Sequence, residues 1–388
     1  MNKIKKLIKE MCPNGVEYKA LGQCVKSLKK GTLKTSELVE TGYPVINSGR
    51  KLYGYYNNFN NIGPSLTIAA RGEYAGFINF FNQKFWAGGL CYPYKSLNEE
   101  NLSTKFIYYF LKNIEKNIRK EIVFDGSIPA LNKQDIEKVK IPIPPIEVQK
   151  EIVKILDKFS ELEEELEEEL EARKKQYEFY NGFLFEISKR KKYVKFGNVA
   201  NIVRGASPRP IKNFITSEKN GYPWIKIGDV SPNDKFITKT KEMITYDGVK
   251  KSRIVRKGDF ILSNSMSFGR PYILGINGCI HDGWLSISDF EKTFTNNFLY
   301  YLLNSEYVQN LFKQKVSSGT VQNLNADIVK SIELPVYTFE EQERIVSILD
   351  KFDKLVNDMK EGLPAEIEFR RKQYEYYRNK LLSFKELS

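Results

Sequence analysis

The pentapeptide ILDKF stands at residues 155–159 and returns unchanged at residues 348–352, an offset of 193 positions. The 24 residues that precede each copy also align without a gap at this offset. A related hexapeptide follows each copy, KQYEFY at 175–180 and KQYEYY at 372–377, now at an offset of 197. A repeat whose period is close to half the chain predicts a duplicated domain instead of a solenoid of short repeats.

The composition is that of a folded protein. The chain of 388 residues is 41% hydrophobic and 13% aromatic, which suits two or three domains with cores of their own. The four cysteines are scattered and form no C-x-x-C motif, which argues against a disulfide framework or a zinc site. The lysine-rich start does not resemble a signal peptide, and no apolar run approaches the ~20 residues of a membrane helix. We therefore expect a soluble, cytoplasmic protein that does not enter a membrane.

The net charge of +13 is unevenly distributed along the chain. Residues 1–145 carry a net charge of +10 and residues 191–335 carry +9, whereas residues 146–190 and 336–388 carry −5 and −1. Two strongly basic segments favour a polyanionic partner, most often nucleic acid. The alternative is a basic surface that serves only solubility.

The two less basic segments, 146–190 and 336–388, are predicted to be helical arms. Their apolar residues recur at spacings of three and four, which places them on one helix face. An unbroken helix of ~40 residues would be about 60 Å long. Gly362 and Pro364 interrupt the second arm, where proline disturbs a helix. The residues predicted to pack between helices are Ile152, Ile155, Phe159, Leu162, Leu166, Tyr177, Ile345, Ile348, Phe352, Leu355, Tyr374 and Leu381.

The acidic run LEEELEEELE at 162–171 could be an acidic functional site, but it fits better an arm whose leucines face another helix while its glutamates face solvent. Such a face would repel phosphates, so the arms are expected to hold protein together and not to grip DNA. Two long helices can pack antiparallel as a coiled coil. We therefore predict an α+β protein in which two such arms join two similar globular domains as a pseudo-two-fold internal repeat.

The globular segments, 1–145 and 191–335, contain short apolar runs separated by glycine- and asparagine-rich turns, followed by a helix. Their basic, amide and aromatic residues are the candidates for contacts with base edges and phosphates. In the second domain, one candidate stretch is 264–272. The predicted DNA-binding residues are Arg50, Lys51, Tyr53, Tyr55, Asn57, Arg71, Arg204, Ser207, Arg209, Lys212, Lys226, Asp229, Asn264 and Arg270.

The sequence lacks the motifs of the common catalytic sites. It has one histidine, His281, and no G-x-S-x-G elbow, no H-E-x-x-H zinc motif and no phosphate-binding loop. His281 is interpreted as a loop or core residue, with a nucleic-acid contact as the alternative. No catalytic residue and no metal ligand is predicted. Two other classes remain open at this point, an enzyme acting on nucleic acid (a methyltransferase or a nuclease) and a coiled-coil scaffold without DNA.

Several stretches carry motifs of a known family. They are DGSIPALN at 125–132, IPIPPIEVQKEIVKILDKF at 141–159, RGASPRP at 204–210, WIKIGDV at 224–230, SFGRPYIL at 267–274 and CIHDGWLSI at 279–287. These stretches resemble the specificity subunits of type I restriction-modification systems. The resemblance covers essentially the whole chain, in the order recognition domain, helix, recognition domain, helix. The second copy departs from it, because LPVYTFEEQ keeps only one of the three prolines of IPIPPIEVQ.

The resemblance implies a subunit without catalytic activity or a cofactor of its own. Each recognition domain would read one half of a bipartite target in double-stranded DNA, and the helices would set the unread spacer. Two methyltransferase subunits carrying S-adenosylmethionine would dock on the chain. Motor-nuclease subunits that use ATP and magnesium would join them for cleavage.

Overall fold

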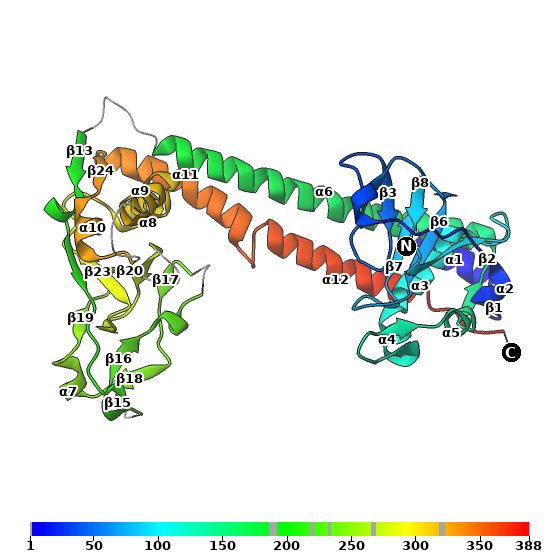
Figure 1. Ribbon diagram of the computed structural model, residues 1–388, viewed down its shortest axis with the longest axis horizontal. Coiled ribbons are helices and arrows are strands. Elements are labelled where there is room, and N and C mark those ends of the chain that lie inside the picture. Colours follow the sequence, from blue (N-terminus) through cyan, green and yellow to red (C-terminus); the bar gives the residue numbers. More distant parts are fainter. Residues whose placement is uncertain are drawn as a thin grey trace. The chain divides into compact units, whose positions relative to one another are not determined.

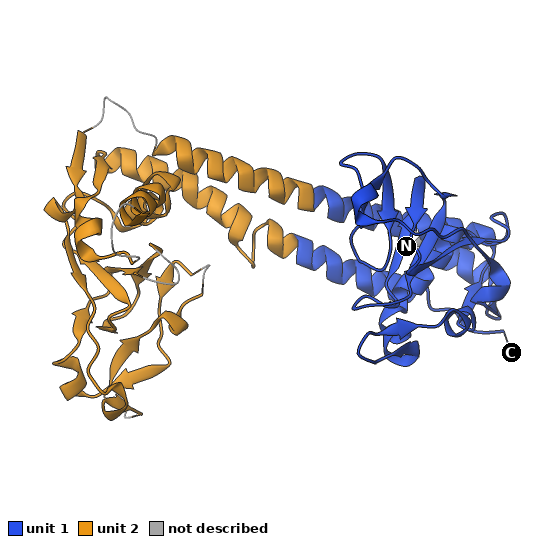
Figure 2. Ribbon diagram, viewed as in Figure 1, with its two compact units in different colours: residues 1–166, 367–388 blue, residues 167–366 orange. Residues whose placement is uncertain are grey.

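The computed structural model (Figure 1) describes most of the chain. The described residues are 2–185, 192–217, 221–231, 234–264, 269–317 and 323–387. Part of the candidate stretch 264–272, namely residues 265–268, and the predicted domain boundary at residue 190 lie outside them. The chain forms two compact units (Figure 2), residues 1–166 with 367–388 (unit 1) and residues 167–366 (unit 2).

Unit 1 contains two four-stranded sheets. In the first, the central strand β6 pairs antiparallel with both β9 and β7, and in the second, β3 pairs parallel with β8. The first sheet has the order β2 (Val25–Ser27), β9 (Cys91–Ser96), β6 (Ser65–Ala69), β7 (Ile78–Phe81). The second has the order β4 (Gly54–Tyr56), β3 (Tyr43–Ile46), β8 (Lys84–Ala87), β5 (Asn61–Ile62).

Unit 2 repeats this plan with five strands in each sheet. Strand β20 pairs antiparallel with β23 and β21 as β6 does with β9 and β7, and β16 pairs parallel with β22 as β3 does with β8. The first sheet has the order β14 (Asn201–Arg204), β23 (Trp284–Ser288), β20 (Phe260–Ser263), β21 (Pro271–Leu274), β17 (Phe236–Ile237). The second has the order β15 (Ile215–Thr216), β18 (Glu242–Ile244), β16 (Tyr222–Ile225), β22 (Gly278–Ile280), β19 (Arg253–Val255).

The main core of each unit lies between its first sheet and a helix rich in aromatic residues. Helix α3 (Thr104–Asn113) contacts β6 and β7, and helix α8 (Asn296–Asn304) contacts β21. Because a helix covers one face and further chain covers the other, β6 and β20 are buried along their whole length. The mixed helix and sheet content confirms the α+β class. The two halves of the sequence repeat fold into units with corresponding sheets.

Each helical arm begins just after a short two-stranded ribbon at the end of its domain. In each unit a two-stranded ribbon closes the domain, with Tyr18 opposite Pro142 in one and Tyr193 opposite Pro335 in the other. These ribbons are β1 (Glu17–Ala20) with β12 (Lys140–Ile143), and β13 (Lys192–Lys195) with β24 (Glu333–Val336). The first arm is helix α6 (Ile146–Leu184), a helix of 39 residues.

The second arm is not one long helix, which corrects the expectation of two long helices. It consists of α11 (Phe339–Asn357) and α12 (Leu363–Leu381), of 19 residues each. At the break, the Asp358 carboxylate accepts hydrogen bonds from the backbone N–H groups of Lys360 and Glu361. A Cβ on Gly362 would lie 2.5 Å from the Lys354 carbonyl oxygen, so the turn requires glycine. Pro364 falls in the first turn of α12, where a missing N–H costs no helical bond.

The repeated ILDKF motif joins each arm to its domain through its aspartate. Asp157 accepts a hydrogen bond of 2.5 Å from the Tyr109 hydroxyl, and Asp350 accepts one of 2.5 Å from Tyr301. Both tyrosines lie on the aromatic helices, α3 and α8. Burial raises the pKa of both phenols, which keeps them protonated as donors. The same hydrogen bond at equivalent positions explains why the chain carries this motif twice.

A buried glutamine makes a second, equally repeated connection. The Gln149 side chain accepts a hydrogen bond from the Ser103 backbone N–H and donates to the carbonyls of Asn101 and Pro144. Gln342, at the offset of 193, makes the corresponding three bonds in unit 2. Both glutamines are completely buried. Each glutamine thereby joins backbone groups before the aromatic helix to a carbonyl that precedes the arm helix.

The phenylalanine of each ILDKF motif packs on tyrosines of the repeated hexapeptide, KQYEFY at 175–180 or KQYEYY at 372–377. In unit 1, the Phe159 ring centroid lies 5.6 Å from that of Tyr377 and 6.1 Å from that of Tyr374. In unit 2, the Phe352 ring lies 5.4 Å from Tyr180. The two repeated motifs, ILDKF and the hexapeptide, therefore contact each other in both units.

The predicted helix-packing residues differ in burial. Ile152, Ile345 and Leu381 are buried, whereas Leu162 is 45% exposed. The completely buried Leu156 and Leu349 belong to the packing face but were not predicted. Each arm contacts both its own domain and a second helix. Its apolar face is therefore wider than the single row of residues predicted from the sequence. The remaining predicted residues, all partly buried, are Ile155, Phe159, Leu166, Tyr177, Ile348, Phe352, Leu355 and Tyr374.

Substitution of Gln149 by leucine is expected to destabilise unit 1. Three hydrogen bonds are lost, and each buried group left without a partner costs about 1–3 kcal/mol, so a total loss of ~3 kcal/mol or more is expected. Native-state hydrogen exchange would measure this as lost protection in α3. The exposed Gln134 offers a matched control, Gln134→Leu. Unchanged protection of α3 in the Gln149→Leu variant would contradict the prediction.

Candidate nucleic-acid interface

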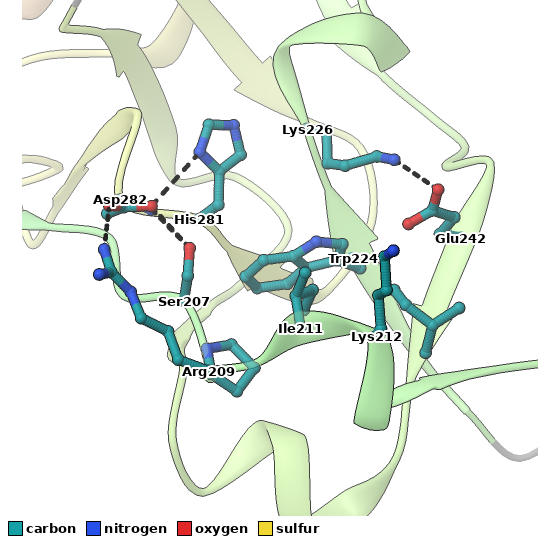
Figure 3. A pocket seen from close by; sticks show the side chains of 11 residues that line it. Ser207, Arg209, Ile211, Lys212, Trp224, Lys226, Glu242, His281 and Asp282 are labelled. Carbon is teal, nitrogen blue, oxygen red and sulfur yellow. Dashed lines mark hydrogen bonds and ion pairs between the residues drawn. The ribbon is translucent and has the colours of Figure 1, made fainter.

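A pocket of about 520 Å³ in unit 2 brings together four of the predicted DNA-binding residues, Ser207, Arg209, Lys212 and Lys226 (Figure 3). They come from the loop after β14, the short helix η3 (Ile211–Asn213) and the end of β16. The other lining residues are Pro208, Ile211, Ile215, Trp224, Glu242, His281 and Asp282. The pocket thus combines cations, an indole, an imidazole and two carboxylates.

Asp282, in the turn between β22 and β23, connects four predicted residues. Its carboxylate accepts a hydrogen bond of 2.6 Å from the Ser207 hydroxyl and forms an ion pair of 3.5 Å with Arg209. Its backbone carbonyl accepts hydrogen bonds from the Arg204 guanidinium at 3.0 Å and from the Asn264 amide at 2.9 Å. The Ser207 hydrogen bond is the main reason that the pKa of Asp282 lies below its usual value. The carboxylate is therefore ionised at neutral pH and attracts the guanidinium.

His281 is fixed next to Asp282 in its neutral form. Its Nδ1 atom accepts a hydrogen bond of 2.8 Å from the Gly283 backbone N–H, so the neutral ring carries its proton on Nε2. Burial lowers the pKa of His281, and the neighbouring Asp282 carboxylate offsets part of this effect. At neutral pH the ring therefore offers one N–H donor and no charge. Its centroid lies 6.3 Å from that of the buried Trp224.

The cations of the pocket differ in their partners. Lys226 forms an ion pair of 2.5 Å with Glu242. Lys212, on η3, is exposed. Asp229 lies just after Lys226, and its carboxylate accepts hydrogen bonds from the backbone N–H groups of Lys226 and Lys241. In this structure Asp229 therefore caps the turn at 227–229.

Arg270 lies apart from these residues. It lines a second pocket of about 510 Å³ in unit 2, together with Tyr177, Tyr300 and Asp350. Its guanidinium lies 6.0 Å from the ring centroid of Tyr272. The DNA-binding residues predicted for unit 2 therefore do not form one site, because Arg270 lies in a different pocket from the four that line the first.

The six predicted residues of unit 1 are all exposed. Arg50 stacks on Tyr74, with the guanidinium carbon 5.2 Å from the ring centroid, and the Tyr53 hydroxyl lies 2.7 Å from that of Thr35. Tyr55 lies on β4, and the Arg71 backbone forms an isolated bridge with Ala130. The other two are Lys51 and Asn57. They are available to a ligand, but among the residues that the structure describes no shared acidic residue connects them as Asp282 does in unit 2.

Sequence reasoning missed Asp282, Trp224 and Glu242 and interpreted His281 as structural. The signal was present in the motif CIHDGW, which contains His281 and Asp282 next to each other. Their roles depend on the loop at 204–209, which is more than 70 positions earlier in the chain. Spacing alone could not pair the two segments.

The described parts of the chain contain no cluster of three or more histidine, cysteine, aspartate or glutamate residues able to hold a metal ion. The four cysteines are free and buried. Among the helices within the described ranges, none is both long enough and apolar enough to cross a bilayer.

Comparison with known proteins gives consistent results along the whole chain. The sequence model of the type I restriction modification DNA specificity domain matches twice, at residues 13–172 and 188–369. A putative type I restriction enzyme specificity subunit of Haemophilus influenzae is 32% identical, over 95% of this chain and 96% of the relative. The specificity subunit of the EcoR124I/EcoR124II type I restriction enzyme of Escherichia coli is 28% identical, over 95% of this chain and 94% of the relative.

Solved structures share the fold. The S subunit of a type I restriction-modification system from M. genitalium superimposes with a TM-score of 0.61 at 19% identity, covering 95% of this chain and 96% of that chain. A chain from a study of complex assembly and conformational transition in the type I system gives a TM-score of 0.61 at 17% identity, with coverages of 95% and 98%. At these identities the superpositions establish a common fold.

Proposed function

We propose, because this chain belongs to the family of type I restriction-modification DNA specificity subunits, that each of its units binds one half of a bipartite target in double-stranded DNA. The chain is a specificity subunit, and subunits of this family are not catalytic. The observation that carries the proposal is the double match of the DNA specificity domain, at 13–172 and 188–369. The two matches coincide with two units that have the same sheet plan.

The division of labour follows the charge. Residues 1–145 and 191–335 are the proposed target-recognition domains, and their net charges of +10 and +9 favour phosphate contacts. Residues 146–190 and 336–388 are the proposed helical spacers, which carry −5 and −1. Base reading would use the exposed side chains of unit 1 and those around Asp282 in unit 2. Lysines and arginines elsewhere would fix the position on the duplex.

The two arms would pack antiparallel as a coiled coil and fix the distance between the half-targets. The proposal is supported by the contact of Phe159 with Tyr377 within unit 1 and that of Phe352 with Tyr180 within unit 2. The guanidinium of Arg371 also forms an ion pair with Glu163 in unit 1. Half-sites one helical turn apart are separated by ~34 Å, a distance that helices of this length can span.

Catalysis would be supplied by other subunits, all in the cytoplasm. Two methyltransferase subunits would bind this chain and carry S-adenosylmethionine. Motor-nuclease subunits, with ATP and magnesium, would complete the assembly. This chain would bind none of these cofactors itself.

Binding and turnover measurements on the purified full chain separate the proposal from its rivals. The chain is expected to bind duplex DNA with an affinity that falls steeply with salt, by ~10³-fold between 50 and 200 mM if about six phosphates are contacted. It should neither transfer methyl groups from S-adenosylmethionine nor cut DNA with magnesium. Absence of DNA binding would favour a scaffold, and turnover that follows the chain through further purification would favour an enzyme.

A further inference from the structure

The Arg209 side chain is exposed and forms an ion pair with a neighbouring carboxylate. It is 83% exposed, yet its Nη2 atom lies 3.5 Å from the Asp282 carboxylate. Asp282 is itself fixed from several sides, since its carboxylate accepts the Ser207 hydroxyl and its carbonyl accepts Arg204 and Asn264. A long, exposed cation therefore lies within ion-pair distance of a hydrogen-bonded carboxylate at the edge of the pocket.

We propose that Arg209 reads a guanine in the half-target bound by unit 2, and that Asp282 is the positioning residue that orients it. The inference rests on the proposed function and extends it to one side chain and one base. The pocket in Figure 3 would then bind the edge of a base in the major groove.

The chemistry of the guanidinium selects this base. An arginine has five N–H donors and no acceptor, so a pair with one carboxylate leaves further donors for a ligand. Guanine presents two adjacent acceptors, O6 and N7, in the major groove, and a guanidinium fork matches both. Adenine presents one acceptor next to an amino donor, which would face an arginine N–H without forming a hydrogen bond. The same fork could also bind a phosphate, so the experiment must distinguish these ligands.

The proposed role of Asp282 is to orient the Arg209 guanidinium. The ion pair is too exposed to contribute much to folding, because solvent screens it. A carboxylate that fixes one side of the guanidinium reduces the rotamer freedom that arginine would lose on binding a base. It also directs the remaining N–H groups away from Asp282.

The two lysines of the pocket differ from Arg209 in what they can bind. Lys226 is already paired with Glu242, whereas Lys212 is exposed and carries a point charge without a fork. Lys212 therefore suits a phosphate, which carries no sequence information. Loss of Lys212 should weaken binding to all sequences alike, and loss of Arg209 should change the preferred sequence.

The test is selection from a randomised duplex library by the full chain, followed by affinity measurements on the selected site. The variants are Arg209→Lys, Arg209→Ala, Asp282→Asn and Asp282→Glu, with Lys212→Ala as the matched control. Arg209→Ala is expected to lose the preference for one guanine, by ~5- to 150-fold, and Arg209→Lys, which lacks the fork, is expected to lose part of it. Asp282→Asn should reduce the same preference, and Asp282→Glu should restore part of it. Replacing that guanine by 7-deazaguanine, which lacks the N7 acceptor, should weaken the wild type and leave Arg209→Ala unaffected.

The half-target bound by unit 1 serves as an internal control for folding, since it should be selected equally by every variant. Lys212→Ala should keep the whole motif and reduce the slope of log affinity against log salt by about one. If Arg209→Ala weakens binding to all sequences alike and keeps the guanine preference, the contact is a phosphate contact and the inference is wrong. If Arg209→Ala changes neither the affinity nor the motif, the inference is also wrong. A wild-type chain that selects no motif would overturn the proposed function, and this inference with it.

Discussion

Exchange of residues 191–335 for the same segment of another specificity subunit is expected to replace one half-target completely and to leave the other unchanged. Each unit has its own pair of sheets and its own core, so the reading surface of unit 1 does not depend on those residues. A single mismatched base pair typically costs ~1–3 kcal/mol, so several changed pairs abolish recognition of the old half-target. Sequencing of methylated sites in cells that express the hybrid with its methyltransferase would measure both halves.

The junctions decide whether the hybrid folds. Gln342 and Asp350 remain in the recipient, and they bond to the Thr295 backbone and the Tyr301 hydroxyl within the exchanged segment. A donor that supplies the tyrosine should work, and one with phenylalanine there should fold less stably. The variant Tyr301→Phe in the unexchanged chain isolates that loss. Alteration of both half-targets in a well-folded hybrid would show that the units do not read DNA independently.

Insertion of four residues between Glu168 and Glu169 is expected to lengthen the spacer and to keep both half-targets. The insertion adds about 6 Å to α6 and keeps its apolar face nearly in phase. One base pair rises ~3.4 Å, so the gap should grow by one or two base pairs. The second arm already has four more residues than the first between its two repeated motifs, which is the change of offset from 193 to 197. The break at 358–362 lies in this extra length and is expected to absorb the difference.

A matched pair of insertions makes this prediction specific. An inserted turn that carries a leucine in phase with Leu166 and Leu170 should preserve packing, and the same turn with a proline should break α6 and reduce methylation. Sequencing of methylated sites gives the spacer and the half-targets from one experiment. Full activity with an unchanged gap would mean that the helices do not set the spacer. Changed half-target bases would mean that the arms shape the reading surface.

The repeat was readable from sequence because duplicated contacts require duplicated residues. Asp157 and Asp350, and likewise Gln149 and Gln342, are identical residues, and each pair makes the same side-chain hydrogen bonds in its own unit. Apolar spacing also predicted α6. It missed Leu156, because spacing shows that a residue lies on an apolar face but not how many neighbours that face contacts.

The break in the second arm was only partly predictable. Gly362 and Pro364 marked its place, but proline by itself indicates a kink in a continuing helix. The helix instead ends and restarts, because Asp358 satisfies the free N–H groups of the turn and Gly362 fits against the carbonyl of Lys354.

The candidate site was predicted by residue type and not by arrangement. Arginine, serine and asparagine are the usual readers of DNA, and four predicted residues meet at Asp282. The aspartate itself escaped prediction because an acidic residue in a DNA-binding segment has no evident attraction for phosphate. Its role becomes visible only when the turn at 281–283 is placed beside the loop at 204–209. Arg270 satisfied the same criterion of residue type and lies in another pocket.

The central claim is that one chain reads two separate half-targets at a fixed distance. Selection of binding sites from a randomised duplex library by the wild-type full chain, with its methyltransferase subunits present, tests this claim most directly. The expected result is a motif of two specified blocks separated by a gap of constant length and unspecified sequence. A single contiguous motif, or two blocks separated by gaps of variable length, would contradict the claim.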